Sequence, residues 1–457
     1  MVGPPASGRA RNGAAGGFRD ARGGACARGA ARRRVPQQPR RGFLRPETLL
    51  RNKWAYRAAS AALPLLRARG AKDYQIAAIE CMLSDFADAY LGRKPCVFTS
   101  AFVPTELVYG LGGVPFLPEA ASGLAAAFGL GAASLSACEA LWYSPDLCSF
   151  HRAGVGGAAA GFLPRPSAVV VTAHLCDGGK KSLAHLSALA GCPFYIIDVP
   201  FASSDRGERW VASQVEFVAE DLARRVPGLS VDGLPRALVA SNEALTEYRE
   251  VCALRRNVPA PWRGSEALNY VLLFLWSWGS PLLAPFYRAL RTHLARTIDT
   301  QGFPVQSERH RLLWLNLRPY YRTKLFEHLE RDRASSVAFE EYSFAYWPAM
   351  DPRDPFVSLA RKMTSNFGWG PIERRLEVIE KLVDEYSIDG VVQFAQWGCR
   401  QSNGGAAIIG SELRKKGVPF LNLDGDGVDD GSEIEAQSIT RLGAFIELLD
   451  ARKVGER

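Results

Sequence analysis

Between residues 46 and 94, apolar residues recur at every third or fourth position. Residues 49–70 and 74–92 both show this spacing, and a glycine ends each segment. The spacing places apolar side chains on one face of a helix, and glycine is common just after a helix end. We therefore expect residues 46–94 to form a helical segment.

From Pro95 onwards, short apolar runs alternate with amphipathic segments. Residues 104–113 and 178–191 have helical spacing, and the runs around them have strand character: 96–100, 114–119, 167–176 and 192–201. Strands separated by helices are typical of βαβ units with parallel strands. This pattern predicts a first α/β domain over residues 95–206.

The pattern is helical between residues 207 and 308 and then alternates again. A strand followed by a loop is expected at 310–321, and further strands at 335–344, 389–399 and 418–427. Expected helices lie at 322–332, 373–387, 403–417 and 435–451. We therefore predict a helical connecting segment over 207–308 and a second α/β domain over 309–457. The expected fold class is α/β, with two Rossmann- or flavodoxin-like parallel-sheet domains facing a cleft and helical N-terminal and interdomain segments.

Charge changes this picture only at the N-terminus. The chain has a net charge of +9, but residues 1–45 hold eleven arginines and a single acidic residue, Asp20, so the remainder is close to neutral. A segment rich in Arg, Gly and Ala cannot bury enough apolar surface to fold, so we expect a disordered tail. Because the basic residues belong to this tail, we do not expect the folded part to bind nucleic acid.

Targeting and membrane signals are weak. The N-terminal segment lacks the apolar core of a secretory signal, and glycine and proline interrupt every turn of a mitochondrial presequence. No apolar run approaches the roughly 18–20 residues that a membrane span needs. The sequence therefore predicts a cytoplasmic protein without membrane association.

The chain has nine cysteines, with irregular spacing and no signal peptide, which favours metal or redox chemistry over a disulfide framework. Three stand in distinctive settings: Cys148 in SPDLCSFHRAG, Cys176 in TAHLCDGG and Cys399 in QWGCRQSNGG. Cys176 and Cys399 each follow an expected strand, at the strand ends where open α/β sheets bind ligands. Cys148 precedes the strand that leads to Cys176. Three thiolates from facing domains can hold an iron–sulfur cluster and leave one iron open.

The other six cysteines are expected to be packing or incidental residues, since a lone buried cysteine commonly acts as a small apolar side chain. They are Cys26, Cys81, Cys96, Cys138, Cys192 and Cys252.

Four polar residues are further candidates. Glu106 begins an expected helix at the cleft and could handle a proton, or could simply be a carboxylate favoured by the helix dipole. Ser402 and Asn403 follow Cys399 and could bind a cluster or thioester, or cap a helix. His174 could lie beside Cys176 or at the surface. The run at 424–430 lacks the spacing of a calcium loop, and we expect a turn.

These motifs resemble the 2-hydroxyacyl-CoA dehydratase family, which also includes subunits of benzoyl-CoA reductase. The resemblance runs from about residue 95 to the end. It is carried by VPTELVYGLGGVPF, SPDLCSFHRAG, HLCDGGKK, IDGVVQFAQWGCRQSNG and FLNLDGDGVDDGSEIEAQSITRLGAFIELL. The last segment is the most specific.

The resemblance implies a [4Fe–4S] cluster bound by Cys148, Cys176 and Cys399, and an acyl-CoA substrate. It implies one-electron reduction of the thioester to a ketyl radical, after which water is eliminated. The electron would come from a separate ATP-dependent iron–sulfur activator, and the chain lacks a GxxxxGK[ST] phosphate loop of its own. The expected partner is a paralogous subunit in a heterodimer, or a second copy in a homodimer. Three alternatives stay open: a benzoyl-CoA reductase-like enzyme, a double-cubane-cluster-type reductase of small molecules, and a non-catalytic electron-relay subunit.

Overall fold

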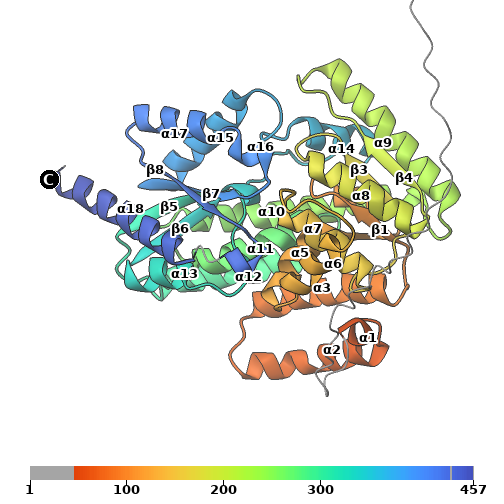
Figure 1. Cartoon of the computed structure of the whole chain (residues 1–457), viewed down its shortest axis with the longest axis horizontal. Coiled ribbons are helices and arrows are strands. Elements are labelled where there is room, and N and C mark those ends of the chain that lie inside the picture. Colours follow the sequence, from red (N-terminus) through yellow and green to blue (C-terminus); the bar gives the residue numbers. More distant parts are fainter. Residues whose placement is uncertain (1–45, 433–434, 456–457) are drawn as a thin grey trace, which may run out of the picture. The chain divides into compact units, whose positions relative to one another are not determined.

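A computed structural model describes residues 46–432 and 435–455, and Figure 1 shows the elements along the chain. The described strands form two four-stranded sheets in which every pairing is parallel. The first has the order β2-β1-β3-β4 and consists of β1 (Cys96–Thr99), β2 (Val114–Phe116), β3 (Ala168–Thr172) and β4 (Phe194–Ile197). The second has the order β6-β5-β7-β8 and consists of β5 (His310–Leu315), β6 (Ser335–Glu340), β7 (Gly390–Gln396) and β8 (Phe420–Gly425). The expected α/β class with two parallel sheets is confirmed.

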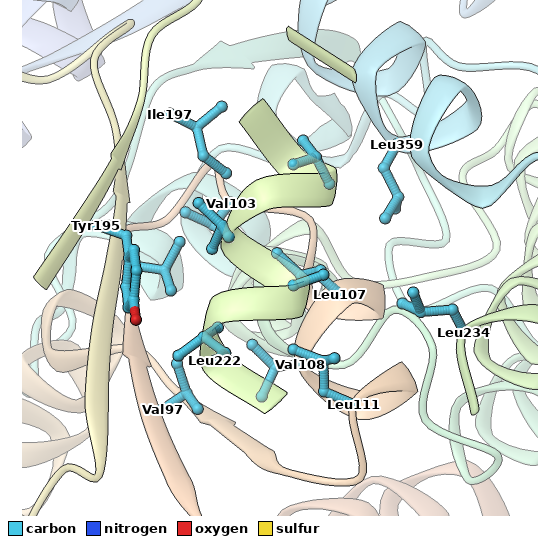
Figure 2. Close-up of a cluster of buried hydrophobic side chains, with 14 of the residues drawn as sticks. Val97, Val103, Leu107, Val108, Leu111, Tyr195, Ile197, Leu222, Leu234 and Leu359 are labelled. Atoms are coloured by element: carbon cyan, nitrogen blue, oxygen red, sulfur yellow. The ribbon is translucent and has the colours of Figure 1, made fainter. Parts of the chain in front are cut away.

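Both faces of the first sheet are buried, because alternate residues of each strand enter different cores. Val97 of β1 belongs to one core, together with Leu107 of α4 (Thr105–Gly110), Leu222 of α9 (Asp205–Arg225) and Leu359 of α14 (Pro355–Thr364). Figure 2 shows these side chains meeting. The neighbouring Phe98 points into the opposite core, which is completed by α3 (Asp73–Tyr90), α5 (Pro118–Ala127), α6 (Gly131–Glu139), α7 (Ser149–Ala159) and α8 (Asp177–Ala190).

The second sheet is covered in the same way. Leu313 and Val391 face the core that contains α15 (Ile372–Glu385) and α17 (Ala406–Lys415). Trp314 and Val392 face the core that contains α13 (Leu325–Glu327) and α18 (Glu435–Gly455). The central strands β1 and β3 are buried along their whole length and are almost continuously apolar, whereas the edge strands β4 and β8 are partly exposed.

The segments before and between the sheets are helical, as expected. They contain α1 (Pro46–Leu50), α2 (Lys53–Ala68), α10 (Leu234–Arg255), α11 (Gly264–Trp276) and α12 (Leu283–Asp299). Residues from α3, α10, α11 and α12 share one apolar core. Among the described residues, no helix has the length and apolar character needed to cross a membrane.

The described residues form a single compact unit. The tail predicted at residues 1–45 lies outside them, and the domain limits predicted at residues 207 and 309 stay predictions.

One expected helix is shorter than predicted. Residues 322–332 form only the turn α13 and a π-helical turn, η2 (His328–Asp332). Leu325, Phe326 and Leu329 are all buried in the second sheet's core, and β6 begins at Ser335, so little chain is left for further turns.

A cavity lined by three cysteines

A cavity of about 1140 Å³ lies at the carboxyl ends of both sheets. It is lined by Phe102 after β1, His174 after β3, Asn316 after β5 and Gln396 at the end of β7. The strand order reverses between β1 and β3 in the first sheet and between β5 and β7 in the second. Open parallel sheets bind ligands at this reversal point. Here two such points open into one cavity.

All three cysteines singled out from the sequence line this cavity. Each is the residue immediately before a helix: Cys148 before α7, Cys176 before α8 and Cys399 before α16 (Arg400–Asn403). The two halves touch here, since a Cβ added to Gly398 would lie 2.5 Å from the backbone nitrogen of Cys148. The structure therefore brings together residues that are more than 250 positions apart.

The thiols are close enough to influence one another. Burial raises the pKa of Cys148 well above its ordinary value, and negative charge on Cys399 and Cys176 would raise it further. Burial also raises the pKa of Cys176 to about 11 and that of Cys399. Burial therefore favours the thiol form of all three, and a metal bound by them would have to displace protons.

Backbone N–H groups at the helix starts offset part of this burial effect. The amide of Gly179 donates to Sγ of Cys176 at 3.4 Å. Amides of Phe150 and Ser402 lower the pKa of Cys148 and Cys399 in the same way. Such donors stabilise a thiolate more than a thiol.

The three thiols can be compared with the requirements of a single ion and of a cluster. Within residues 46–432 and 435–455, no three His, Cys, Asp or Glu side chains are grouped closely enough to hold one metal ion. In an iron–sulfur cluster the thiolates bind different irons, so they need not converge on one point. Three thiols on separate helix starts, around a cavity of this size, fit that requirement.

Sequence reasoning missed the surroundings of Cys176. Nε2 of His151 lies 3.0 Å from its Sγ, and Nδ1 of the same ring lies 3.8 Å from Oε1 of Glu119. Burial lowers the pKa of His151 and raises that of Glu119. The signal was present in the sequence, because His151 comes three residues after Cys148 and therefore lies one helical turn into α7.

Glu106 is placed behind the cavity wall rather than on it. The residue is fully buried and does not line the cavity. Its Oε1 is 2.7 Å from Nζ of Lys362, which does line the cavity, and it accepts a hydrogen bond from Ser241. Its expected position facing the cleft is therefore taken by Lys362, a residue of α14 that the sequence did not single out.

The remaining candidates differ in position. Ser402 lines the cavity, and its buried hydroxyl has no partner among the described residues. Asn403 does not line it, and its side chain donates to the carbonyl of Gln396 at 2.8 Å. His174 lines the cavity with both ring nitrogens unpartnered, and burial lowers its pKa to about 3. The run at 424–430 forms a turn, in which Asp426 accepts from the amides of Val428 and Asp429.

The chain is similar in sequence to a known protein family and to several characterised enzyme subunits. Residues 100–449 match the family model described as 2-hydroxyglutaryl-CoA dehydratase, D-component. The chain is 22% identical to the (R)-phenyllactyl-CoA dehydratase alpha subunit of Clostridium sporogenes, over 77% of this chain and 89% of the relative. It is 22% identical to a subunit of the benzoyl-CoA reductase of Thauera aromatica, over 69% and 80%. It is 20% identical to the lactoyl-CoA dehydratase subunit alpha of Anaerotignum propionicum, over 79% and 92%.

Proposed function

The chain belongs to the 2-hydroxyglutaryl-CoA dehydratase D-component family, and on this premise we propose that it is an iron–sulfur cluster-binding subunit of a 2-hydroxyacyl-CoA dehydratase-like complex. The observation that carries the proposal is the convergence of Cys148, Cys176 and Cys399 on one cavity. Relatives named as dehydratase alpha subunits support the reaction class.

In this proposal the three thiolates hold a [4Fe–4S] cluster. When bound, such a cluster supplies one-electron reduction and the Lewis acidity of an open iron. The helix-start amides around Cys148, Cys176 and Cys399 favour the thiolate form that ligation requires.

The chain's own residues bind the thioester and manage protons. Elimination of water from a 2-hydroxyacyl-CoA removes hydroxide from C2 and a proton from C3, so the cavity needs a group that can exchange a proton. We assign this role to Glu106, with Lys362 as the member of the pair that lines the cavity. The unpartnered hydroxyl of Ser402 is proposed to bind the thioester. Asn403, the second residue predicted to bind substrate, is proposed instead to support the Cys399 turn through its bond to the carbonyl of Gln396.

Two partners complete the proposal. The proposed substrate is an acyl-CoA, and the relatives' designation as alpha subunits supports a paralogous second subunit, with a homodimer as the alternative. The low-potential electron is proposed to come from a separate ATP-dependent iron–sulfur activator.

Anaerobic iron and sulfide analysis with EPR tests the cluster directly. We expect about four irons per chain in the wild type, lost in Cys148→Ala, Cys176→Ala and Cys399→Ala. Cys192→Ala is the matched control, because Cys192 is also half-buried but does not line the cavity. A folded, iron-free wild type, or variants that keep their iron, would contradict the proposal.

A reductase is the second candidate, because a benzoyl-CoA reductase subunit is among the relatives. With the activator and the second subunit present, product analysis separates the two. A dehydratase yields a 2-enoyl-CoA without net consumption of electrons, whereas a reductase consumes electrons in proportion to product. A double-cubane-type reductase would contain more iron than one [4Fe–4S] cluster provides, and an electron-relay subunit would bind no acyl-CoA.

A further inference from the structure

A continuous set of six aromatic residues forms one part of the cavity lining. These residues, the aromatic wall, are Phe274, Trp278, Phe344, Tyr346, Trp347 and Phe367. Their rings contact one another in sequence: Phe344 with Phe367 at 5.7 Å, Phe367 with Tyr346 at 5.7 Å, Tyr346 with Trp347 at 5.0 Å and Trp347 with Trp278 at 4.9 Å. Phe274 contacts both tryptophans.

Two tryptophans of the aromatic wall are almost fully buried. Trp278 and Trp347 are both 3% exposed and both line the cavity, yet the indole N–H of each lacks a hydrogen-bond partner among the described residues. Because these nitrogen atoms are themselves buried, the two tryptophans offer the cavity their ring carbons rather than a hydrogen-bond donor.

The charge beside the wall is already balanced. Nζ of Lys362 lies 3.9 Å from the ring centroid of Trp347 and 5.2 Å from that of Trp278. The same ammonium is 2.7 Å from Oε1 of Glu106 and is buried with it. The region therefore contains a cation, but one whose counter-charge is supplied by the protein.

From these observations we infer that the aromatic wall selects an uncharged aromatic acyl group on the CoA thioester; the inference rests on the proposed function and names its substrate class. An aryl side chain can pack against several rings of the wall at once, through the edge-to-face and offset contacts that such rings favour. An acyl group that ends in a carboxylate would bury a second negative charge beside Glu106, and Lys362, the cation that lies against the wall, is already paired with that glutamate.

Equilibrium binding tests the selection without relying on turnover. The cluster-loaded protein is titrated by calorimetry, under anaerobic conditions, with the CoA thioesters of 2-hydroxy-3-phenylpropanoate and 2-hydroxypentanedioate, and with free CoA. We expect the phenyl thioester to bind at least about tenfold more tightly than the dicarboxylate. Trp347→Ala should weaken the phenyl thioester by about tenfold and leave the dicarboxylate and free CoA unchanged. Trp210→Ala, at a half-exposed position on α9 outside the cavity, is the control.

A second variant reverses the preference. Glu106→Gln removes the counter-charge of Lys362, so the dicarboxylate should gain affinity relative to the phenyl thioester, and circular dichroism checks that the variant folds. If this variant does not fold, the thioester affinities of Trp347→Ala alone test the inference.

Two kinds of failure are distinguishable. Equal binding of the two thioesters by the wild type, or an equal loss for both in Trp347→Ala, overturns the inference and leaves the proposed function in place. Absence of binding for every thioester by cluster-loaded protein overturns the proposed function, and the inference with it.

Discussion

Asp85 of α3 shows how burial alone can set the charge of a residue in this protein. Its carboxylate accepts a hydrogen bond from the hydroxyl of Tyr109 at 2.6 Å, which favours the ionised form. Burial outweighs that bond and raises the pKa of Asp85 from 3.8 to about 7. The folded state therefore holds this proton more tightly than the unfolded chain does.

Asp85→Asn should consequently stabilise the protein at alkaline pH. Because the folded pKa is raised, the contribution of Asp85 to stability is fully present below about pH 4 and is lost as the pH rises through about 7, by an amount on the order of 4 kcal/mol. The asparagine removes this loss and can still accept from Tyr109. Urea unfolding at pH 5 and pH 8 measures the effect, with the exposed Asp73→Asn as control. The reasoning is contradicted if the unfolding free energy changes between pH 5 and pH 8 by the same amount in Asp85→Asn as in the wild type.

His151 is expected to tune the cluster rather than hold it. Its Nε2 lies 3.0 Å from Sγ of Cys176, so an N–H there can donate to a ligating thiolate. Hydrogen bonds to cluster sulfurs stabilise the more negative, reduced state and raise the reduction potential. His151→Leu should therefore keep its iron but show a lower potential in an EPR-monitored titration. His185→Leu should not differ from wild type, because His185 does not line the cavity, although Tyr143, to which its ring bonds, does. Loss of iron in His151→Leu would indicate a structural role instead.

At the scale of elements, the contact between Gly398 and Cys148 holds the two sheets' cysteines together. Gly398 has φ +73°, and a Cβ there would lie 2.5 Å from the backbone nitrogen of Cys148. Gly129 has the same φ but nothing within 4 Å of its added Cβ. The two glycines therefore separate the cost of a left-handed backbone from the cost of a close approach.

We expect Gly398→Ala to lose iron and Gly129→Ala to keep it. Both variants pay roughly 1–2 kcal/mol for the left-handed conformation, but only Gly398→Ala must also push Cys148 away from Cys399. Thermal unfolding and iron content, measured on both variants, test this. Similar iron content in the two variants would show that the loop adjusts without moving the cysteines.

Element identity could be predicted where local pattern and tertiary packing agree. The buried runs that form β3 and β7 were recognisable from their apolar residues alone. Helix α7 was not, because Gly154, Gly156 and Gly157 interrupt it and make it look like a loop. Gly156 is needed for packing, since a Cβ there would lie 1.7 Å from the carbonyl oxygen of Ser134 in α6. Long-range packing overrides the weak helix propensity of glycine, and a single sequence does not display it.

At the scale of the whole molecule, the sequence could predict the cysteines but not the far side of the cavity. Cys176 and Cys399 follow strands, so the shared edge of parallel sheets brings them towards one cleft. Lys362 depends instead on α14, a helix that packs on the first sheet's core although it follows β6 in sequence, and the aromatic wall combines residues 274 and 278 with residues 344–367. Nothing local marks that placement, which is why Glu106 was expected at the cavity surface where Lys362 lies.

A buried hydrogen-bond network joins the two sheets beside the cysteines. The hydroxyl of Ser149, the residue after Cys148, donates to Oδ1 of Asp426 at 2.6 Å. Gln396, at the end of β7, donates to the other carboxylate oxygen of Asp426 and to Ser149, and its Oε1 accepts from the amide of Gly427 at 2.7 Å. The polar groups of these residues are therefore fully hydrogen-bonded only when the part of the chain that contains the first sheet contacts the part that contains the second.

Asp426→Ala should therefore weaken both folding and cluster binding. It leaves the buried hydroxyl of Ser149 and the amides of Val428 and Asp429 without their acceptor, at a cost of about 1–3 kcal/mol for each buried group left unpaired. Urea unfolding gives the stability loss, and iron analysis gives the loss of the cluster. Asp424→Ala, which removes a more exposed carboxylate paired with Arg441, is the matched control and should change neither.

A double-mutant cycle with Ser149→Ala decides whether the network acts across the two halves. If Ser149 and Asp426 stabilise the same contact, the double variant should lose less than the sum of the single losses, by about 0.5–3 kcal/mol, as residues in one network do. Additive losses would mean that Asp426 acts only on its own turn. In that case the cysteines would be held in register by the Gly398 contact alone, and the iron content of Ser149→Ala would equal that of the wild type.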